Sequence, residues 1–315
     1  MNVLDTMKST SVALNTCDTD DATYEVPSYE PLDSLMASIQ RVGILQPPVL
    51  QEQTDGRLIP VLGRRRLQAM KRLGMHEVTV HLLPSTLGKD HCFRLAFWDN
   101  LPCRSWNAAV TAVVVRKLLE LFSPVTVAQE FLPVLRIPPK GPMLQRLVSI
   151  GSLEPVVLEA LAAGRIHEKT ALILSRMKPT ERLTLLELTE RLKLNVNKRG
   201  ELIEHLFDLA VFHRTDVLGF LEDPEVRALL AEEEKPAVQR GDALRASIRR
   251  KKFPEIAVRE AQFTEWLKRQ GTIPGITVRP DPNFEGNGCT VEVRLENWEQ
   301  AAKLLATARN LLAVP

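Results

Sequence analysis

The segment VLGRRRLQAM, residues 61–70, places three arginines directly after a glycine at the start of an expected helix. Leu67 and Met70 recur at helical spacing, so the helix begins near Gly63 and the arginines at 64–66 occupy its first turn. A helix N-terminus carries partial positive charge, and each added cation there costs roughly 0.3–1 kcal/mol unless an anion offsets it. The sequence therefore predicts an anion at this turn; a surface helix whose arginines are solvated is the alternative.

The residues around this turn predict a small α/β module. An amphipathic helix is expected over 31–43, ended by Gly43, and strands are expected over 47–53, 57–63 and 77–83. The module ends near Pro84. Residues 1–27 are polar and acidic without a clear period, which predicts a flexible lead-in.

The rest of the chain predicts two further parts. Residues 85–270 follow an almost wholly helical pattern, in which GPMLQRLVSIG, residues 141–151, is a candidate second helix of a helix-turn-helix. Simple helix packing is the alternative interpretation of this pair. Residues 271–315 predict a strand-strand-helix unit too small to bury a core alone, so we expect it to form a homodimer. The buried face of its helix would be formed by Leu304, Leu305, Leu311 and Leu312.

The composition is that of an ordinary globular protein. The chain has 315 residues, of which 44% are hydrophobic and 25% are charged, and its net charge is +2, so any affinity for anions must come from local clusters. The four cysteines form no CxxC pair, which argues against a disulfide framework or a zinc knuckle. The longest apolar run is too short to span a bilayer, and the first residues lack the features of a signal peptide. We therefore expect a soluble cytoplasmic protein.

Common catalytic motifs are missing from the sequence. It contains no G-x-S-x-G, and its six histidines form neither HxxxH nor HExxH. These patterns argue against a serine hydrolase and against a zinc hydrolase. The arginine turn remains the strongest candidate site, because backbone N–H groups and arginines at a helix start bind phosphate well.

Residues 35–84 resemble the N-terminal domain of the ParB/RepB family of plasmid and chromosome partition proteins. The resemblance lies in the helix, in a G-x-x-Q-P turn at Gly43, Gln46 and Pro47, and in the strand that leads to a G-E-R-R-x-R-A box beginning at Gly63. It continues more weakly through DNLPCRSWNAAVTA, residues 99–112, and through residues 154–174. Together these parts cover about residues 30–176. The resemblance implies a multidomain α+β protein with a ParB/sulfiredoxin-like α/β domain over 28–84, a helical domain over 85–270 and a C-terminal dimerisation unit over 271–315.

The family resemblance also implies a CTP-dependent DNA clamp. The N-terminal domain would bind CTP with magnesium, the helical domain would read a DNA site and the C-terminal unit would dimerise. The cofactor-binding residues would be Gly43, Gln46, Pro47, Gly63, Arg65, Arg66 and Asn100, with Asn100 also near the Mg ion. A ParA-like Walker-type ATPase is the expected protein partner, and the nucleoid is the expected location.

The sequence departs from the family pattern at several positions. Arg64 replaces the glutamate of the box, and Gln68 replaces its last arginine. In the second motif Asp99 stands for a glutamate, while Pro102 and Cys103 stand for Gln and Arg. Asp99 is the candidate catalytic residue, but its shorter side chain positions a water less well. We therefore expect at most a weak CTPase. Sulfiredoxin chemistry needs a cysteine at position 64, and a nuclease needs an acidic cluster, so both are disfavoured.

Two groups of residues are candidates for DNA contact. The degenerate helix-turn-helix, crowded by four prolines, offers Lys140, Gln145 and Arg146. The cluster RASIRRKKF, residues 245–253, offers Arg249, Arg250 and Lys251 for contact with the phosphate backbone, with a solvated helix face as the alternative. The expected function is plasmid or chromosome partition, or nucleoid organisation. An adaptor that keeps the nucleotide fold but recruits protein partners is the rival.

Overall fold

The computed structural model of the protein describes residues 7–271, 275–284, 286, 288–294 and 306. The chain divides into two compact units, Met1–Leu186 with Asn195–Gly200, and Glu187–Leu194 with Glu201–Pro315. This border lies within the helical part, whereas the sequence predicts borders at 84 and 270.

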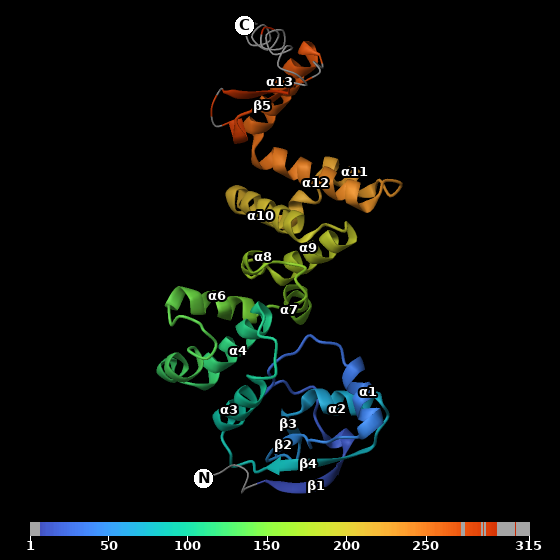
Figure 1. Cartoon of the computed structure of the whole chain (residues 1–315), viewed down its shortest axis with the longest axis vertical. Helices are drawn as coiled ribbons and strands as arrows, with labels where there is room; N and C mark the ends of the chain where they lie inside the picture. Colours follow the sequence, from blue (N-terminus) through green and yellow to red (C-terminus); the bar gives the residue numbers. More distant parts are fainter. Residues whose placement is uncertain (1–6, 272–274, 285, 287, 295–305, 307–315) are drawn as a thin grey trace. The chain divides into compact units, whose positions relative to one another are not determined.

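The first unit contains a four-stranded mixed sheet in the order β1-β4-β2-β3 (Figure 1). Its strands are β1 (Lys8–Ala13), β2 (Val49–Glu52), β3 (Leu58–Leu62) and β4 (Glu77–Leu83). β1 is antiparallel to β4 and β2 to β3, whereas β2 and β4 are parallel, with Val49 opposite His81. Strands β2, β3 and β4 lie where the sequence predicts strands, which confirms the mixed α/β character of the N-terminal part.

Strand β1 shows that the expected flexible lead-in over residues 1–27 is wrong from residue 8 onward. β1 pairs with β4 from Lys8 opposite Leu82 to Ala13 opposite Glu77. After β1 the chain continues through the 3-10 turn Leu14–Thr16 to Tyr24, whose side chain is buried. Hydrophobic periodicity misses this strand because an edge strand gains its backbone hydrogen bonds from one neighbour and needs few apolar residues.

Helices α1 (Asp33–Val42) and α2 (Arg64–Arg72) share a hydrophobic core with the sheet. Leu67 and Met70 of α2 are fully buried in this core, and burying such a side chain contributes roughly 1.5–3 kcal/mol. As predicted, Gly43 ends α1, and its φ of 71° is one that favours glycine. Gly63 has φ of 80° directly before α2. The arginine turn therefore follows a left-handed glycine and belongs to a helix that packs into the core.

The remaining helices of the first unit follow the sheet in the chain. They are α3 (Lys89–Asn100), α4 (Ala108–Leu121), α5 (Pro124–Thr126), α6 (Gly141–Gly151), α7 (Pro155–Ala162) and α8 (Glu168–Leu174). The side chain of Asn107 caps α4 by accepting from the N–H of Val110 at 3.0 Å. α4 and α6 pack side by side (Figure 1), and their backbones touch at Gly151.

The candidate helix-turn-helix has an irregular first half. α5 passes into a short π-helical turn, Val127–Phe131, and the chain then runs through turns and extended backbone until α6 begins. α6 spans the segment predicted as the second helix. Pro138 and Pro139 disfavour α-helical backbone at the residues directly before them, in line with the non-helical backbone of residues 137–140.

The second unit contains most of the remaining helices and a hairpin. α9 (Pro179–Arg191) and α10 (Val196–His213) cross the border between the units, and they are followed by α11 (Pro224–Ala231), α12 (Ala237–Lys252) and α13 (Pro254–Gln270). Short 3-10 turns lie at Val217–Phe220 and Pro282–Phe284. β5 (Ile276–Pro280) and β6 (Cys289–Val293) form an antiparallel pair, as predicted. The predicted dimerisation leucines at 304, 305, 311 and 312 lie outside the described residues, so the dimer stays a prediction.

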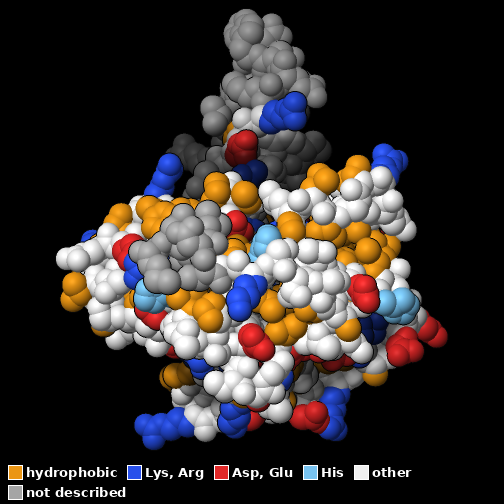
Figure 2. Space-filling view, turned by 90° about the horizontal axis from the view of Figure 1, so that it is seen from below, with side chains coloured by type: hydrophobic (Ala, Val, Ile, Leu, Met, Phe, Trp, Pro, Cys, Tyr) orange, Lys and Arg blue, Asp and Glu red, His pale blue; other side chains and the backbone are white. Residues whose placement is uncertain are grey.

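The surface carries no dominant charge on the face drawn in Figure 2. Basic and acidic side chains are interspersed there among apolar areas, in line with the net charge of +2. Within the described part of the chain, no helix has the length and apolar character needed to cross a membrane. An anion site on this protein must therefore be a local arrangement of cations.

Candidate functional site

The three arginines at the start of α2 point to three different segments of the chain. Arg64 donates to the carbonyl of Asp21 and places its Nε 3.5 Å from Oε1 of Glu25. Arg66 folds back over Gly63 and donates to the carbonyl of Gln46. In this structure the unfavourable charge at the helix start is therefore offset by carboxylates and carbonyls of the protein itself.

Arg65 makes the most extensive contacts of the three. It donates to Oε2 of Glu30 at 2.9 Å, to the carbonyl of Glu30 at 3.0 Å and to the carbonyl of Pro31 at 2.7 Å. The side chain of Glu30 is 64% exposed, whereas that of Arg65 is 19% exposed. The cation is thus held inside the wall of a cleft, and the carboxylate lies at its open side.

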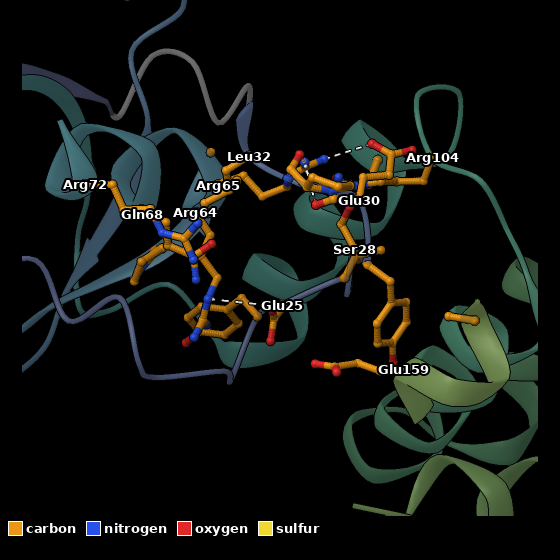
Figure 3. Close-up of a pocket in the computed structure, with 18 of the residues that line it drawn as sticks. Glu25, Ser28, Glu30, Leu32, Arg64, Arg65, Gln68, Arg72, Arg104 and Glu159 are labelled. Atoms are coloured by element: carbon orange, nitrogen blue, oxygen red, sulfur yellow. Dashed lines mark hydrogen bonds and ion pairs between the residues drawn. The ribbon is translucent and has the colours of Figure 1, made fainter. Parts of the chain in front are cut away.

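This cleft has a volume of about 600 Å³, within the range usual for small-molecule sites. Its walls come from the segment before α1, the start of α2, the end of α3 and the end of α7 (Figure 3). Five arginines line it against three glutamates. The charged lining residues are Arg64, Arg65, Arg72, Arg104, Arg165, Glu25, Glu30 and Glu159. The surplus of arginines makes the cleft suited to an anionic ligand with several negative charges.

Arg104 is a functional candidate that the sequence comparison missed. Its Nε donates to Oδ1 of Asn100 at 2.8 Å, and Asn100 in turn donates to the carbonyl of Ala96 at 2.7 Å. Burial lowers the pKa of Arg104, and the neighbouring charge of Arg65 lowers it further. Two guanidinium groups that repel each other in a partly buried cleft bind an anion favourably, because the anion removes the repulsion.

Arg104 lies one residue after the position at which the resemblance expects an arginine. Cys103 occupies the position at which the resemblance expects an arginine, and Arg104 follows it directly. Because Asn100 and Arg104 are four residues apart, one turn brings their side chains together at the end of α3. Tyr29, Glu30 and Glu159 also line the cleft. No motif marked these three, because they reach the cleft only through the tertiary fold.

The structure brings together only part of the predicted nucleotide site. Gly63, Arg65 and Asn100 line the cleft. Gly43, Gln46, Pro47, Arg66 and Asp99 are not among its lining residues, although Arg66 and Gln46 bond to each other. Burial lowers the pKa of Arg66, an effect that the negative charge of Asp99 opposes. Asp99 itself is exposed, and its catalytic role stays a prediction.

The role of Asn100 near a magnesium ion stays a prediction. Its amide oxygen accepts a hydrogen bond from the guanidinium of Arg104. No cluster of three or more His, Cys, Asp or Glu side chains suited to a metal ion occurs among the residues with described placement. Magnesium commonly binds through ligand phosphates and only one or two protein carboxylates.

The predicted DNA-binding residues fall into two groups with different surroundings. Lys140, Gln145 and Arg146 are exposed at the beginning of α6. In the second unit, the basic residues of α12 are paired with carboxylates: Arg249 with Glu260 at 2.9 Å, Arg250 with Glu225 at 2.5 Å and Lys251 with Asp223 at 2.8 Å. Hydrogen bonding to Lys251 lowers the pKa of Asp223, and hydrogen bonding to Glu260 raises that of Arg249. α12 therefore presents ion pairs where the sequence predicts free cations.

Comparison with known proteins gives the class of this fold. Residues 10–100 match the family model of the ParB N-terminal domain, which confirms the resemblance and includes most of strand β1 and all of helix α3. The matched region contains the arginine turn, Asn100 and most of β1, a strand within the residues that the sequence predicts to be flexible. The match runs over residues 10–100, whereas the sequence predicts a domain over 28–84, and the predicted boundaries stay a prediction.

Among curated proteins, similarity extends beyond this domain. A probable chromosome-partitioning protein ParB of Campylobacter jejuni is 24% identical over 177 residues, which is 56% of this chain and 61% of that protein. A nucleoid occlusion protein of a Geobacillus species is 28% identical over 182 residues, which is 58% of this chain and 63% of that protein. The matched region thus spans about three fifths of the length of these relatives.

Structures of ParB proteins are among the solved structures with similar chains. A pNOB8-like ParB N-domain has 16% identity and a TM-score of 0.36, covering 78% of this chain and 97% of that one. A C-terminally truncated chromosome-partitioning protein ParB of Caulobacter crescentus, complexed with CTP-γ-S, has 20% identity and a TM-score of 0.25. That match covers 57% of this chain and 97% of the other.

Proposed function

We propose that the cleft at the start of α2 binds the triphosphate of a nucleotide, CTP, and that the chain acts as a ParB-like DNA-binding protein. Its process would be chromosome or plasmid partition, or nucleoid occlusion, as in the relatives named above. The observation that carries this proposal is the convergence of Arg64, Arg65 and Arg104 on one cleft within or directly after the region that matches the ParB N-terminal domain.

The physical basis is the electrostatics of the helix start. The first N–H groups of α2 have no intrahelical acceptor, and the helix dipole adds partial positive charge to that of the arginines. A triphosphate carries enough negative charge to replace the carboxylates that now offset these cations. Arginine donates to phosphate through two parallel hydrogen bonds, which fixes the orientation of the ligand as well as its affinity.

Asn100 and Gly63 have supporting roles in this proposal. Asn100 fixes the guanidinium of Arg104 in the cleft through its hydrogen bond of 2.8 Å. Gly63 supplies the left-handed turn before α2, and any side chain there would also press on the guanidinium of Arg66. Magnesium would bind through phosphate oxygens of the ligand. Hydrolysis would be slow or absent, because the candidate Asp99 is exposed and lies outside the lining of the cleft.

DNA contact is proposed for the exposed start of α6, through Lys140, Gln145 and Arg146. Ligand binding would gate this contact and so form a clamp. The adaptor function remains the second candidate, favoured by the ion pairs that neutralise α12. Gel-shift titration against genomic fragments at several salt concentrations separates the two, since a site-specific protein keeps its preference where non-specific contacts weaken.

Calorimetric titration with CTP and magnesium tests the nucleotide site. We expect Arg65→Ala and Arg104→Ala each to weaken binding by about 10- to 100-fold, because each removes charge-assisted hydrogen bonds. Arg57→Ala is the matched control, since Arg57 is an exposed arginine of the same domain that pairs with Asp55 outside the cleft. If all three variants bind CTP with the affinity of the wild type, the cleft is not the nucleotide site.

A further inference from the structure

Residues 27–31, which we name the Glu30 strap, run along one side of the cleft. Ser28, Tyr29, Glu30 and Pro31 all line it. The strap connects two buried residues, Val26 and Leu32. Proline at each end of the strap restricts the backbone, so the strap is a short stiff segment between two fixed points.

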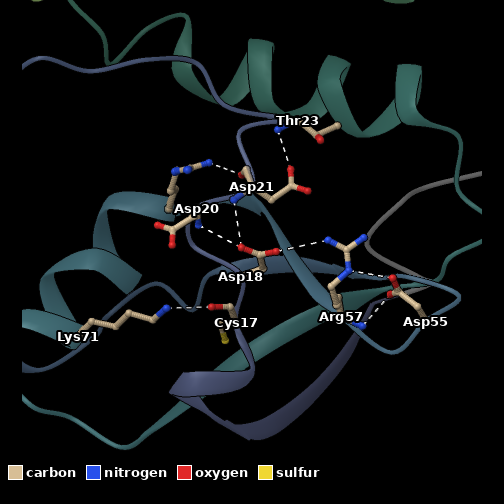
Figure 4. Close-up of polar contacts among 9 residues, drawn as sticks. Cys17, Asp18, Asp20, Asp21, Thr23, Asp55, Arg57 and Lys71 are labelled. Atoms are coloured by element: carbon tan, nitrogen blue, oxygen red, sulfur yellow. Dashed lines mark hydrogen bonds and ion pairs between the residues drawn. The ribbon is translucent and has the colours of Figure 1, made fainter. Parts of the chain in front are cut away.

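The chain before the strap has several anchors besides the contacts of Arg64 with Asp21 and Glu25. The hydroxyl of Tyr24 donates to Oε1 of Gln51 at 2.5 Å, and Nζ of Lys117 donates to the carbonyl of Glu25 at 2.8 Å. Farther back, Asp18 accepts from the N–H groups of two following residues, and Lys71 donates to the carbonyl of Cys17 at 3.0 Å (Figure 4). Movement of the strap therefore need not disturb the segment before it.

The strap itself is held to α2 by Arg65. All three hydrogen bonds donated by Arg65 end on Glu30 and Pro31, at 2.7 to 3.0 Å. Figure 3 shows the two side chains meeting on the same side of the cleft as Arg104. The charge of Glu30 also acts on Arg104, whose pKa it raises against the effect of burial. One carboxylate thus faces two cations of the proposed phosphate site.

We propose that Glu30 is an internal competitor for the phosphate site, so that a triphosphate binds only by displacing the Glu30 strap from Arg65. The inference rests on the proposed function of the cleft. A guanidinium offers one planar set of donors, which cannot serve the carboxylate and a phosphate at the same time. Two anions in one cleft also repel each other. Because Glu30 is 64% exposed, its pair with Arg65 is weak enough for a multiply charged ligand to replace it.

The consequence is a coupling between ligand and strap. Binding releases residues 27–31 from α2, and the side of the cleft then changes shape and charge. A surface that forms only in the ligand-bound state would thereby be created beside the cleft.

Glu30→Gln tests the competition, because it keeps the size of the side chain and removes its charge. Titration of the full chain with CTP and, separately, with inorganic tripolyphosphate should show about three- to fivefold tighter binding of both ligands, the effect expected for losing an exposed ion pair. Glu52→Gln is the matched control, since Glu52 is exposed at the end of β2 outside the cleft. We expect no change for this variant.

The outcomes separate the strap from the nucleotide site. If Glu30→Gln binds tripolyphosphate as tightly as the wild type does, or more weakly, the proposed competition is wrong, regardless of the result with CTP. Tighter tripolyphosphate binding without any CTP binding supports the competition and overturns the proposed nucleotide function. If tripolyphosphate binds neither protein, the cleft is no phosphate site and both proposals fail.

Discussion

Gly151 lies where α6 meets the backbone of α4, so replacing it by alanine pushes the two helices apart. A Cβ atom at Gly151 would lie 2.7 Å from the carbonyl carbon of Ala112 and 3.0 Å from the backbone N of Val113, with the carbonyl oxygen of Ala112 closer still. Ordinary contact begins near 3.4 Å. The neighbours are backbone atoms, so no side-chain rotation relieves the overlap, and the helices must separate locally.

The expected loss of stability for Gly151→Ala follows from two opposing terms. Overpacking costs about 1–3 kcal/mol, and a rigid backbone contact places this variant near the upper limit. Alanine offsets up to about 1 kcal/mol of this loss, because it favours a helix more than glycine does. We therefore expect a net loss of about 2 kcal/mol, which lowers the melting temperature of a unit of this size by roughly 4–8 °C.

Thermal denaturation followed by circular dichroism measures this change. Gly141→Ala is the matched control on the same helix, because a Cβ atom there has no neighbour within 4 Å. We expect this control to melt at or slightly above the wild-type temperature. Equal melting temperatures for the two variants would refute the close approach of α4 and α6.

Three further predictions concern buried and paired polar groups. Burial lowers the pKa of Lys117 to about 8 from its ordinary 10.5, so between these pH values the unfolded state binds more protons and the free energy of unfolding rises with pH. Lys117→Met should reduce this rise by about 1 kcal/mol per pH unit, measured by urea unfolding between pH 8 and 9. Equal pH slopes for the variant and the wild type would contradict the lowered pKa. Arg249→Glu should lower the stability of the second unit by roughly 0.2–1 kcal/mol without changing DNA affinity, because it breaks the ion pair with Glu260. Adding Glu260→Arg should restore the stability. A loss of DNA affinity with unchanged stability would indicate that Arg249 contacts DNA. Tyr24→Phe should cost about 1 kcal/mol in urea unfolding, because it removes the hydrogen bond to buried Gln51, and a variant as stable as the wild type would show that this bond does not anchor the chain.

The sequence predicts elements whose signal is local. α2 is recognisable because Leu67 and Met70 recur at helical spacing after a glycine, and both prove to be buried. Gly43 ends α1 for the same kind of local reason. β1 gives no such signal, since its residues are mostly polar and its partner, β4, lies about seventy residues away in the chain. The strand exists because the sheet has a free edge there, which is a tertiary property.

The cleft shows the same limit for functional residues. Arg65 was predictable, because three cations at a helix start are unfavourable without an anion. That the anion in this structure is Glu30 was not predictable, because thirty-five positions separate the two residues. Arg104 was missed because matching the motif position by position stopped at Cys103, whereas one helical turn from Asn100 reaches Arg104. The ion pairs of α12 were likewise not predictable from the sequence, because the carboxylates come from other helices.

Hydrogen exchange of the purified chain with and without CTP and magnesium tests the nucleotide site most directly. The account predicts slower exchange of the backbone amides of residues 63–66 and 100–104, which surround the proposed phosphate position, and unchanged exchange in the β5–β6 pair of the second unit. Equal exchange at residues 63–66 with and without saturating CTP would contradict it.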